Sequence, residues 1–222
     1  MLEWWTYSLS DFLMFAPRTY YRLVGIANAQ AWPLQVFALA AGAALLAPAV
    51  RRSRLAAAIL AIAWAWVAWA WLLRHYATIN WAAEYFAIAF LLQAALLAAF
   101  ALRSAGPGAA AAPLLRRLGT VFVALALAGA PLASVLAGRG LETAEVFGLT
   151  PDPTVLATLG VVATTTPVAR AVLLPIPLAW CAIAGATLWT MDAPEWWVMP
   201  LAGATVLGAV LAVSRMRAAR PF

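Results

Sequence analysis

The sequence has very little charge, and its positive charge is of one kind. Only 10% of the 222 residues are charged, all fourteen basic residues are arginine, and lysine is absent. A soluble globular domain carries about 25% charged residues, so this chain has too few to cover a soluble surface. The shortage of charge excludes an ordinary cytosolic enzyme, a nucleic-acid-binding domain and a disordered chain.

Cysteine and histidine each occur once. The single cysteine, Cys181, excludes an internal disulfide and any paired-cysteine redox or zinc motif. Its apolar neighbours predict a small buried side chain rather than a nucleophile. His75 has no cluster of further ligands at metal-binding spacing, and no Ser/His/Asp arrangement can be assembled around it. The sequence therefore predicts no catalytic residue, no metal ion and no cofactor.

Long apolar runs fill most of the chain, which is 66% hydrophobic with a mean hydropathy of +0.91. A helix needs about 20 apolar residues to cross a hydrocarbon core of about 30 Å. Seven runs predict an all-α, polytopic transmembrane helical bundle. The predicted spans are residues 31–50, 55–73, 81–102, 118–137, 147–166, 171–190 and 196–213. The fifth run is the weakest, and a re-entrant half-helix is its alternative.

Charge placement decides between these alternatives. If all seven runs span, one side of the membrane receives only arginine, and the other receives every acid. The arginine side holds Arg51, Arg52, Arg54, Arg103, Arg116, Arg117, Arg170, Arg215, Arg217 and Arg220. The opposite side holds Glu3, Asp11, Glu84, Glu142, Glu145, Asp152, Asp192 and Glu195, with four further arginines. Because short cytoplasmic loops are enriched in basic residues, we predict seven spans with the N-terminus outside and the C-terminus inside.

This topology divides the chain into six segments. We expect an outer-face interfacial segment at 1–30, three spans within 31–102, a flexible cytoplasmic linker at 103–117 and the fourth span at 118–137. An outer loop and the last three spans follow at 138–213, and a basic cytoplasmic tail closes the chain at 214–222. The two triplets of spans have the same orientation, so a parallel 3+1+3 repeat is a further hypothesis.

Three polar residues around the third span are candidates for binding a substrate or ion. Glu84 is the only acid inside one of the six strong spans, and an intramembrane acid is a functional hypothesis by default. The alternative is an interfacial carboxylate that reaches water or pairs with Arg74. His75 is either a proton-relay group or an exposed interfacial side chain. Gln93, inside the span, is either part of a substrate site or a contact between helices.

The stretch Pro151-Asp152-Pro153-Thr154 is the most unusual short segment. Asp152 or Thr154 can cap the helix that follows, and the positive end of that helix could hold an anion. The threonines beyond it make this span the most polar, so their hydroxyls either face other helices or bond back to their own helix.

Tryptophan is unusually frequent, with 12 residues placed mostly near the predicted outer boundary. An aromatic belt at the membrane interface explains most of them. It does not explain why the belt is one-sided, and a cation-attracting aromatic mouth is the alternative. Trp64 and Trp180 fall nearer the middle of the membrane and complete the set of candidate binding residues.

Several motifs resemble one family across nearly the whole chain. They are Asn28-Ala29-Gln30-Ala31-Trp32-Pro33-Leu34-Gln35, Ile79-Asn80-Trp81-Ala82-Ala83, Phe147 to Thr154 with Thr158-Leu159-Gly160, and Leu174-Pro175-Ile176-Pro177-Leu178-Ala179-Trp180. The sequence resembles the bacterial multipass membrane proteins of domain of unknown function 6064. In that family cysteine often stands between the two prolines, where this chain has Asp152. The resemblance implies an integral membrane protein without an established activity, and no thiol role transfers.

Two functions from different classes follow from these observations. The first is transport of a small solute or cation through an inner-membrane protein with an outer-face site. The alternative is a non-catalytic membrane component that binds a protein partner or a lipid. An intramembrane enzyme that uses Glu84 or His75 ranks third. The expected partners are the lipid bilayer, a small solute or cation, and a second copy or another membrane protein, with no nucleic acid.

Overall fold

Every regular element in the described part of the chain, residues 15–103 and 111–218 of a computed structural model, is a helix. Four helices are long and apolar enough to cross a membrane, and counting each of two bent helix pairs as a span raises the number to six. The four are Arg54–Thr78, Ala83–Arg103, Pro113–Leu136 and Val198–Met216. The predicted all-α architecture with apolar helices of spanning length is confirmed.

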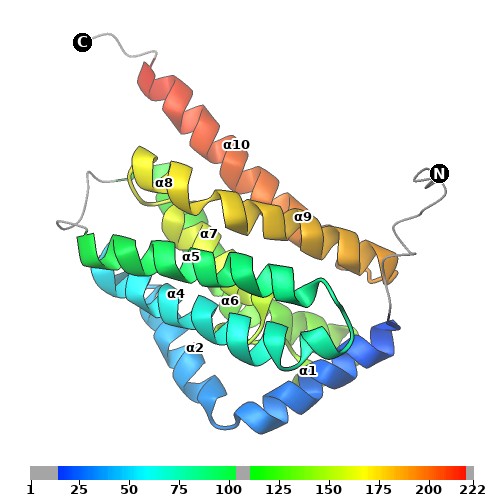
Figure 1. Cartoon of the computed structure of the whole chain (residues 1–222). Coiled ribbons are helices and arrows are strands. Elements are labelled where there is room, and N and C mark those ends of the chain that lie inside the picture. Colours follow the sequence, from blue (N-terminus) through cyan, green and yellow to red (C-terminus); the bar gives the residue numbers. More distant parts are fainter. Residues whose placement is uncertain (1–14, 104–110, 219–222) are drawn as a thin grey trace, which may run out of the picture.

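The first predicted span is bent sharply at its start. Helices α1 (Pro17–Ala31) and α2 (Leu34–Ala44) meet at 94°, and Figure 1 shows them as a corner at the lower edge of the molecule. Pro33 has no backbone N–H and restricts the residue before it, so α1 cannot continue straight into α2. The run is divided once more, because the short α3 (Pro48–Arg51) follows after a turn. Of the predicted interfacial segment 1–30, residues 1–14 lie outside the described part, and most of the remainder forms α1.

The second and third predicted spans pack against each other. Helix α4 (Arg54–Trp66) begins after Ser53, whose hydroxyl accepts a hydrogen bond from the Leu55 amide. It continues as a π-helix, η3 (Val67–Leu73), and the short 3-10 helix η4 (Tyr76–Thr78) leads the chain toward α5 (Ala83–Arg103). The fully buried Trp64 ring of α4 lies 4.2 Å, centroid to centroid, from the Phe90 ring of α5. This aromatic contact ties the two helices together near their middle.

The fifth predicted span is a short, enclosed helix. Helix α7 (Pro151–Val162) has 12 residues and, apart from Asp152, all of them are buried. At 1.5 Å per residue it is about 18 Å long, well short of a hydrocarbon core of about 30 Å. A helix that is apolar all round needs protein or lipid on every side. In this fold the neighbouring helices surround α7, so it is enclosed by protein although it is shorter than the other predicted spans.

Glycine allows α7 to approach α6 (Pro113–Leu136) very closely. A Cβ atom added at Gly119 of α6 would lie 2.6 Å from the Gly160 carbonyl oxygen, and one added at Gly160 would lie 2.8 Å from the Gly119 carbonyl oxygen. Small residues at such crossings let two helix backbones touch. The Gly119–Gly160 crossing therefore sets the distance between α6 and α7.

The threonine hydroxyls of α7 bond back to their own helix and also contact another helix, the two roles that the sequence left open. Thr154 and Thr158 donate to the carbonyls of Thr150 and Thr154, at 2.7 and 2.8 Å. Thr158 also accepts a hydrogen bond of 2.8 Å from the indole Nε1 of Trp64. One hydroxyl thus satisfies its own helix and links α7 to α4.

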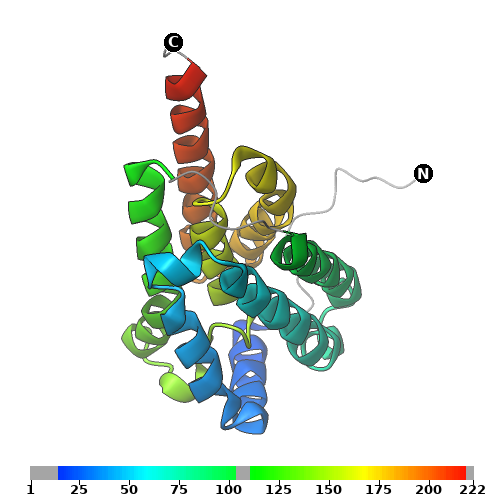
Figure 2. The same ribbon diagram turned by 90° about the vertical axis from the view of Figure 1, so that its left-hand side faces the viewer.

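The remaining helices form the last two predicted spans. Helices α8 (Pro167–Leu173) and α9 (Pro175–Thr190) are bent by 44°, and α10 (Val198–Ala218) follows. The last turns of α10 stand away from the other helices in Figures 1 and 2. Helix α6 begins inside the predicted linker 103–117, and α10 continues into the predicted tail 214–222, so the helices extend further than the apolar runs alone indicate.

Candidate functional site

The loop between α6 and α7 places an acid beside the start of α7. Gly138, Gly140 and Gly148 have φ values of 69°, 81° and 77°, a region that glycine enters without steric cost. Asn28 of α1 holds the loop, since its side-chain amide donates to two loop carbonyls at 2.8 and 2.9 Å. These constraints bring Glu145 close to Asp152.

Each of these two carboxylates is held by an aromatic donor from another helix. The Tyr20 hydroxyl of α1 donates to Oε1 of Glu145 at 2.5 Å. The Trp180 indole Nε1 of α9 donates to Oδ1 of Asp152 at 2.8 Å. Both carboxylates are half-buried and line the same groove, so a molecule in that groove can reach them.

The surroundings of Glu145 favour its neutral form. Burial raises the pKa of Glu145, and the nearby Asp152 carboxylate raises it further, while the Tyr20 hydrogen bond acts in the opposite direction. The folded protein therefore binds the Glu145 proton more tightly than an unfolded chain does. Stability from this proton is complete at acidic pH and is lost as pH rises through the raised pKa.

A third acid beside these two, Glu195, is already paired with an arginine. Arg139 makes an ion pair of 2.6 Å with Glu195, and its guanidinium lies 4.0 Å from the centre of the Tyr21 ring. The Tyr21 hydroxyl donates to the same Glu195 carboxylate at 3.3 Å. Within residues 15–103 and 111–218 this is the only ion pair, so Glu145 and Asp152 have no paired cation there.

The groove that these residues share has a volume of about 440 Å³. Its polar end carries Tyr21, Arg139, Glu145, Asp152 and Glu195, which we call the acidic end. Its walls are apolar and come from α6, α7 and α10. They include Phe122, Leu125, Gly129, Leu156, Leu201 and Ala202. The volume lies within the range of about 300–1,000 Å³ for small-molecule sites.

Asp152 also lines a second, much smaller cavity with aromatic walls. It measures about 20 Å³ and is lined by Tyr20, Trp71, Tyr76 and Trp180. A cavity of about 10–15 Å³ is enough for one water molecule, so this space suits water rather than a solute. Asp152 thus lines both the aromatic cavity and the larger groove.

The structure brings some predicted site residues together. Asp152 and Trp180 are hydrogen-bonded, and Thr154 lies fully buried two residues after Asp152 in α7. Trp64 belongs to the core between α4, α5 and α7. Gln93 is also fully buried, and its amide donates to the Leu173 carbonyl at 3.1 Å.

Asp152 is the only one of the predicted residues that lines the groove, and Glu84 and His75 lie elsewhere. Glu84 is exposed at the start of α5 and makes no ion pair with any described residue. Its proposed partner, Arg74, instead lies over the Trp69 ring, 4.8 Å from its centroid. His75 lines a separate cavity between α1 and η3.

The sequence did not single out Tyr20, Arg139, Glu145 or Glu195 as a group. Tyr20 and Glu145 are 125 positions apart, and Arg139 and Glu195 are 56 positions apart. The loop glycines before the proline-rich stretch were the one local signal near Glu145. Their positive φ values are visible only in the folded loop.

Comparison with known proteins gives one match. A model described as "Family of unknown function (DUF6064)" matches residues 18–221. No curated protein and no solved structure matches the chain.

Proposed function

The chain belongs to the DUF6064 family of unknown function, and from this premise we propose that it is a membrane protein that binds an amphiphilic lipid in the groove between α6, α7 and α10. This is the lipid-binding alternative raised by the sequence. One observation carries it: a cavity of about 440 Å³ has apolar walls along its length and ionisable groups at one end.

The walls of the groove match an acyl chain. Leu125 of α6 and Leu201 of α10 line the groove and are 46% and 54% exposed, so its sides continue onto the lipid-facing surface of the bundle. An acyl chain could therefore enter sideways from the bilayer. A polar solute would gain little from these walls, which is why the geometry favours a lipid over the small solute or cation of the transport hypothesis.

The acidic end matches a particular kind of head group. Three carboxylates stand there against the single guanidinium of Arg139, which is already paired with Glu195. A head group with an ammonium or hydroxyl donor would satisfy the oxygens of Glu145 and Asp152, whereas a purely anionic one would meet no unpaired cation among the groove's described residues. Phosphatidylethanolamine has such an ammonium and is the lipid we choose as a probe.

Filling the groove tests this function directly. Gly129 lines it, and a Cβ atom there would meet only Leu125 side-chain atoms, at 3.8 and 3.9 Å. In Gly129→Trp the indole would occupy the acyl-chain space without meeting another backbone. We expect binding of pyrene-labelled phosphatidylethanolamine to the protein in nanodiscs to weaken about tenfold or more, because a steric block opposes the bound state only.

The matched control is Gly208→Trp. Gly208 is exposed on α10, and an added Cβ there has no atom within 4 Å. This variant adds the same indole to the lipid-facing surface and should bind the labelled lipid like the unmodified protein. Equal binding by Gly129→Trp and Gly208→Trp would assign the signal to lipids that coat the whole bundle and would overturn the proposal.

We also propose the orientation predicted from the sequence in a bacterial inner membrane, with the arginine side in the cytoplasm. Of the seven proposed crossings, the fifth needs the residues of 147–166 that flank the short α7 as well as the helix itself. In support of this orientation, the start of α4, the end of α5 and the start of α6 gather at one end of the bundle in Figure 1, and these ends carry Arg54, Arg103 and Arg116. The acidic loop 141–152 belongs to the opposite end. The parallel 3+1+3 repeat stays a prediction.

Cysteine labelling tests the orientation, because Cys181 is the sole native thiol. In a Cys181→Ala background, the exposed Glu142→Cys should react with a membrane-impermeant maleimide in intact cells. The exposed Arg52→Cys should react only after lysis. The reverse pattern would place the arginine side outside and contradict the predicted orientation.

A further inference from the structure

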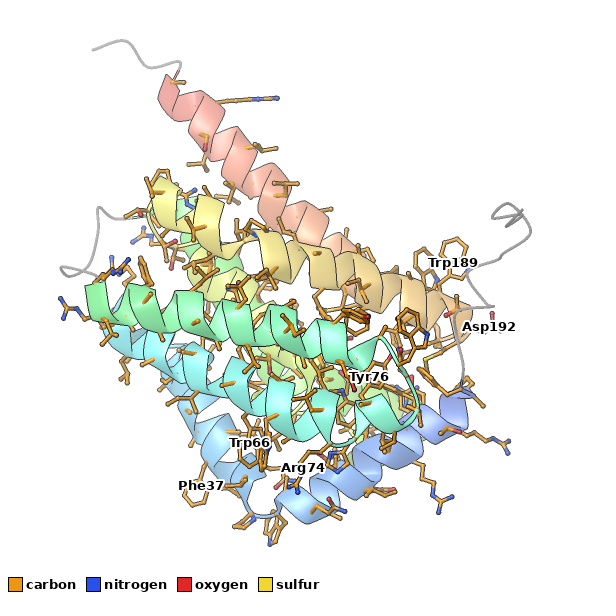
Figure 3. The ribbon with its side chains drawn as sticks, viewed as in Figure 1. Phe37, Trp66, Arg74, Tyr76, Trp189 and Asp192 are labelled. Atoms are coloured by element: carbon orange, nitrogen blue, oxygen red, sulfur yellow. The ribbon has the colours of Figure 1, made fainter. Side chains whose placement is uncertain are left out.

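The cavity that His75 lines lies between α1, the start of α2 and η3. It has a volume of about 150 Å³ and shares no lining residue with the groove. Figure 3 places Trp66 and Arg74 at this cavity. The other side chains used below are Trp69, Trp71 and His75 from η3 and the turn after it, and Gln30 from α1.

The Arg74 side chain places a positive charge at this cavity, and no acidic side chain of the cavity wall balances it. Arg74 is exposed, lies over the Trp69 ring and forms no ion pair within the described residues. No acidic residue lines the cavity. Since arginine stays protonated at any physiological pH, the cavity has an uncompensated positive charge at its wall.

The remaining wall is rigid and aromatic. The His75 ring is held on both sides, with Nδ1 at 2.5 Å from the Ala70 carbonyl and Nε2 at 3.1 Å from Oε1 of Gln30. It stacks on Trp71, which is only 2% exposed. The π-helical η3 presents these groups, and π-helical segments are frequent at functional sites.

We propose that this cavity binds a small organic carboxylate. The guanidinium of Arg74 matches a carboxylate with two parallel hydrogen bonds, and the indole rings of Trp66 and Trp69 enclose the apolar part of the ligand. The volume is about ten times the 10–15 Å³ that one water needs, yet below the 300 Å³ or so of drug-sized pockets. The apolar rings favour an organic carboxylate over inorganic phosphate. This inference does not depend on the lipid groove.

Benzoate is a suitable probe, and benzamide is its neutral counterpart. We expect benzoate to bind the purified full-length protein in saturation-transfer NMR and calorimetric titrations, with benzamide and phosphate binding about tenfold more weakly or worse, because charge-assisted pairing is lost or the rings find no apolar partner. Arg74→Gln should weaken benzoate binding by a similar factor. Arg22→Gln, an exposed arginine of α1 outside the cavity, should leave it unchanged.

A second variant distinguishes loss of the binding site from a folding defect in Arg74→Gln. Leu34→Trp would fill the cavity from α2 while keeping Arg74, and it should also remove benzoate binding. Gly129→Trp in the lipid groove should bind benzoate normally, so failure of one proposal leaves the other testable. Any one of four results would overturn the carboxylate site. Two are equal affinity for benzoate and benzamide, and equal affinity for benzoate and phosphate. The other two are unchanged benzoate binding by Arg74→Gln, and no benzoate binding at all.

Discussion

Replacing Gly119 by leucine is expected to push α6 away from α7 and to destabilise the fold more than any surface change. An added Cβ would stand 2.6 Å from the Gly160 carbonyl oxygen, and this neighbour is backbone that cannot rotate away. Overpacking of a close contact costs about 1–3 kcal/mol and occasionally more, and we expect the upper end, about 3 kcal/mol. Helix α7 would be displaced from its enclosed position, and Asp152 at its start would move with it.

Thermal unfolding of the detergent-solubilised protein, followed by tryptophan fluorescence and size-exclusion chromatography, measures this effect. Gly208→Leu is the control, since it makes the same substitution in an apolar helix of spanning length where an added Cβ meets nothing within 4 Å. It should unfold at the temperature of the unmodified protein. A Gly119→Leu protein as stable as Gly208→Leu would contradict the close crossing of α6 and α7.

Replacing Trp64 by alanine should also lower the stability of the fold strongly. Its side chain is fully buried, packs on Phe90 and donates a hydrogen bond to Thr158, so the substitution leaves a cavity between α4, α5 and α7. Truncating a buried tryptophan to alanine costs about 3–5 kcal/mol. The sequence offered Trp64 as a binding residue, and this result would identify a packing role for it.

The same unfolding assay separates the two contributions of Trp64. Thr158→Val removes the hydroxyl that accepts the indole N–H while keeping the volume, and should cost about 1 kcal/mol. Trp81→Ala is the control, because Trp81 is 60% exposed and its loss should change stability by about 0.5 kcal/mol or less. If Trp64→Ala proved as harmless as Trp81→Ala, the indole would not be a packing element of the core.

Much of the architecture follows from the sequence because its causes are local. An apolar run of about 20 residues favours a helix of spanning length, and Arg54–Thr78, α5, α6 and α10 lie where such runs predict them. The runs at 31–50 and 147–166 are instead divided or shortened. Proline marks helix starts for a similarly local reason, since its missing N–H would be unpaired in the first turn anyway. Pro17, Pro113 and Pro167 each stand at such a start.

The tertiary structure alone decided what the polar residues do. Asp152 has Trp180 as its partner, 28 positions away, and Glu145 has Tyr20, whereas Glu84, the acid that stood out in the sequence, stays at the surface. Hydropathy describes how each segment meets the membrane, but it carries no information on which helix faces which. The choice of partner depends on contacts such as the Gly119–Gly160 crossing, where two segments distant in sequence meet and exclude every larger side chain.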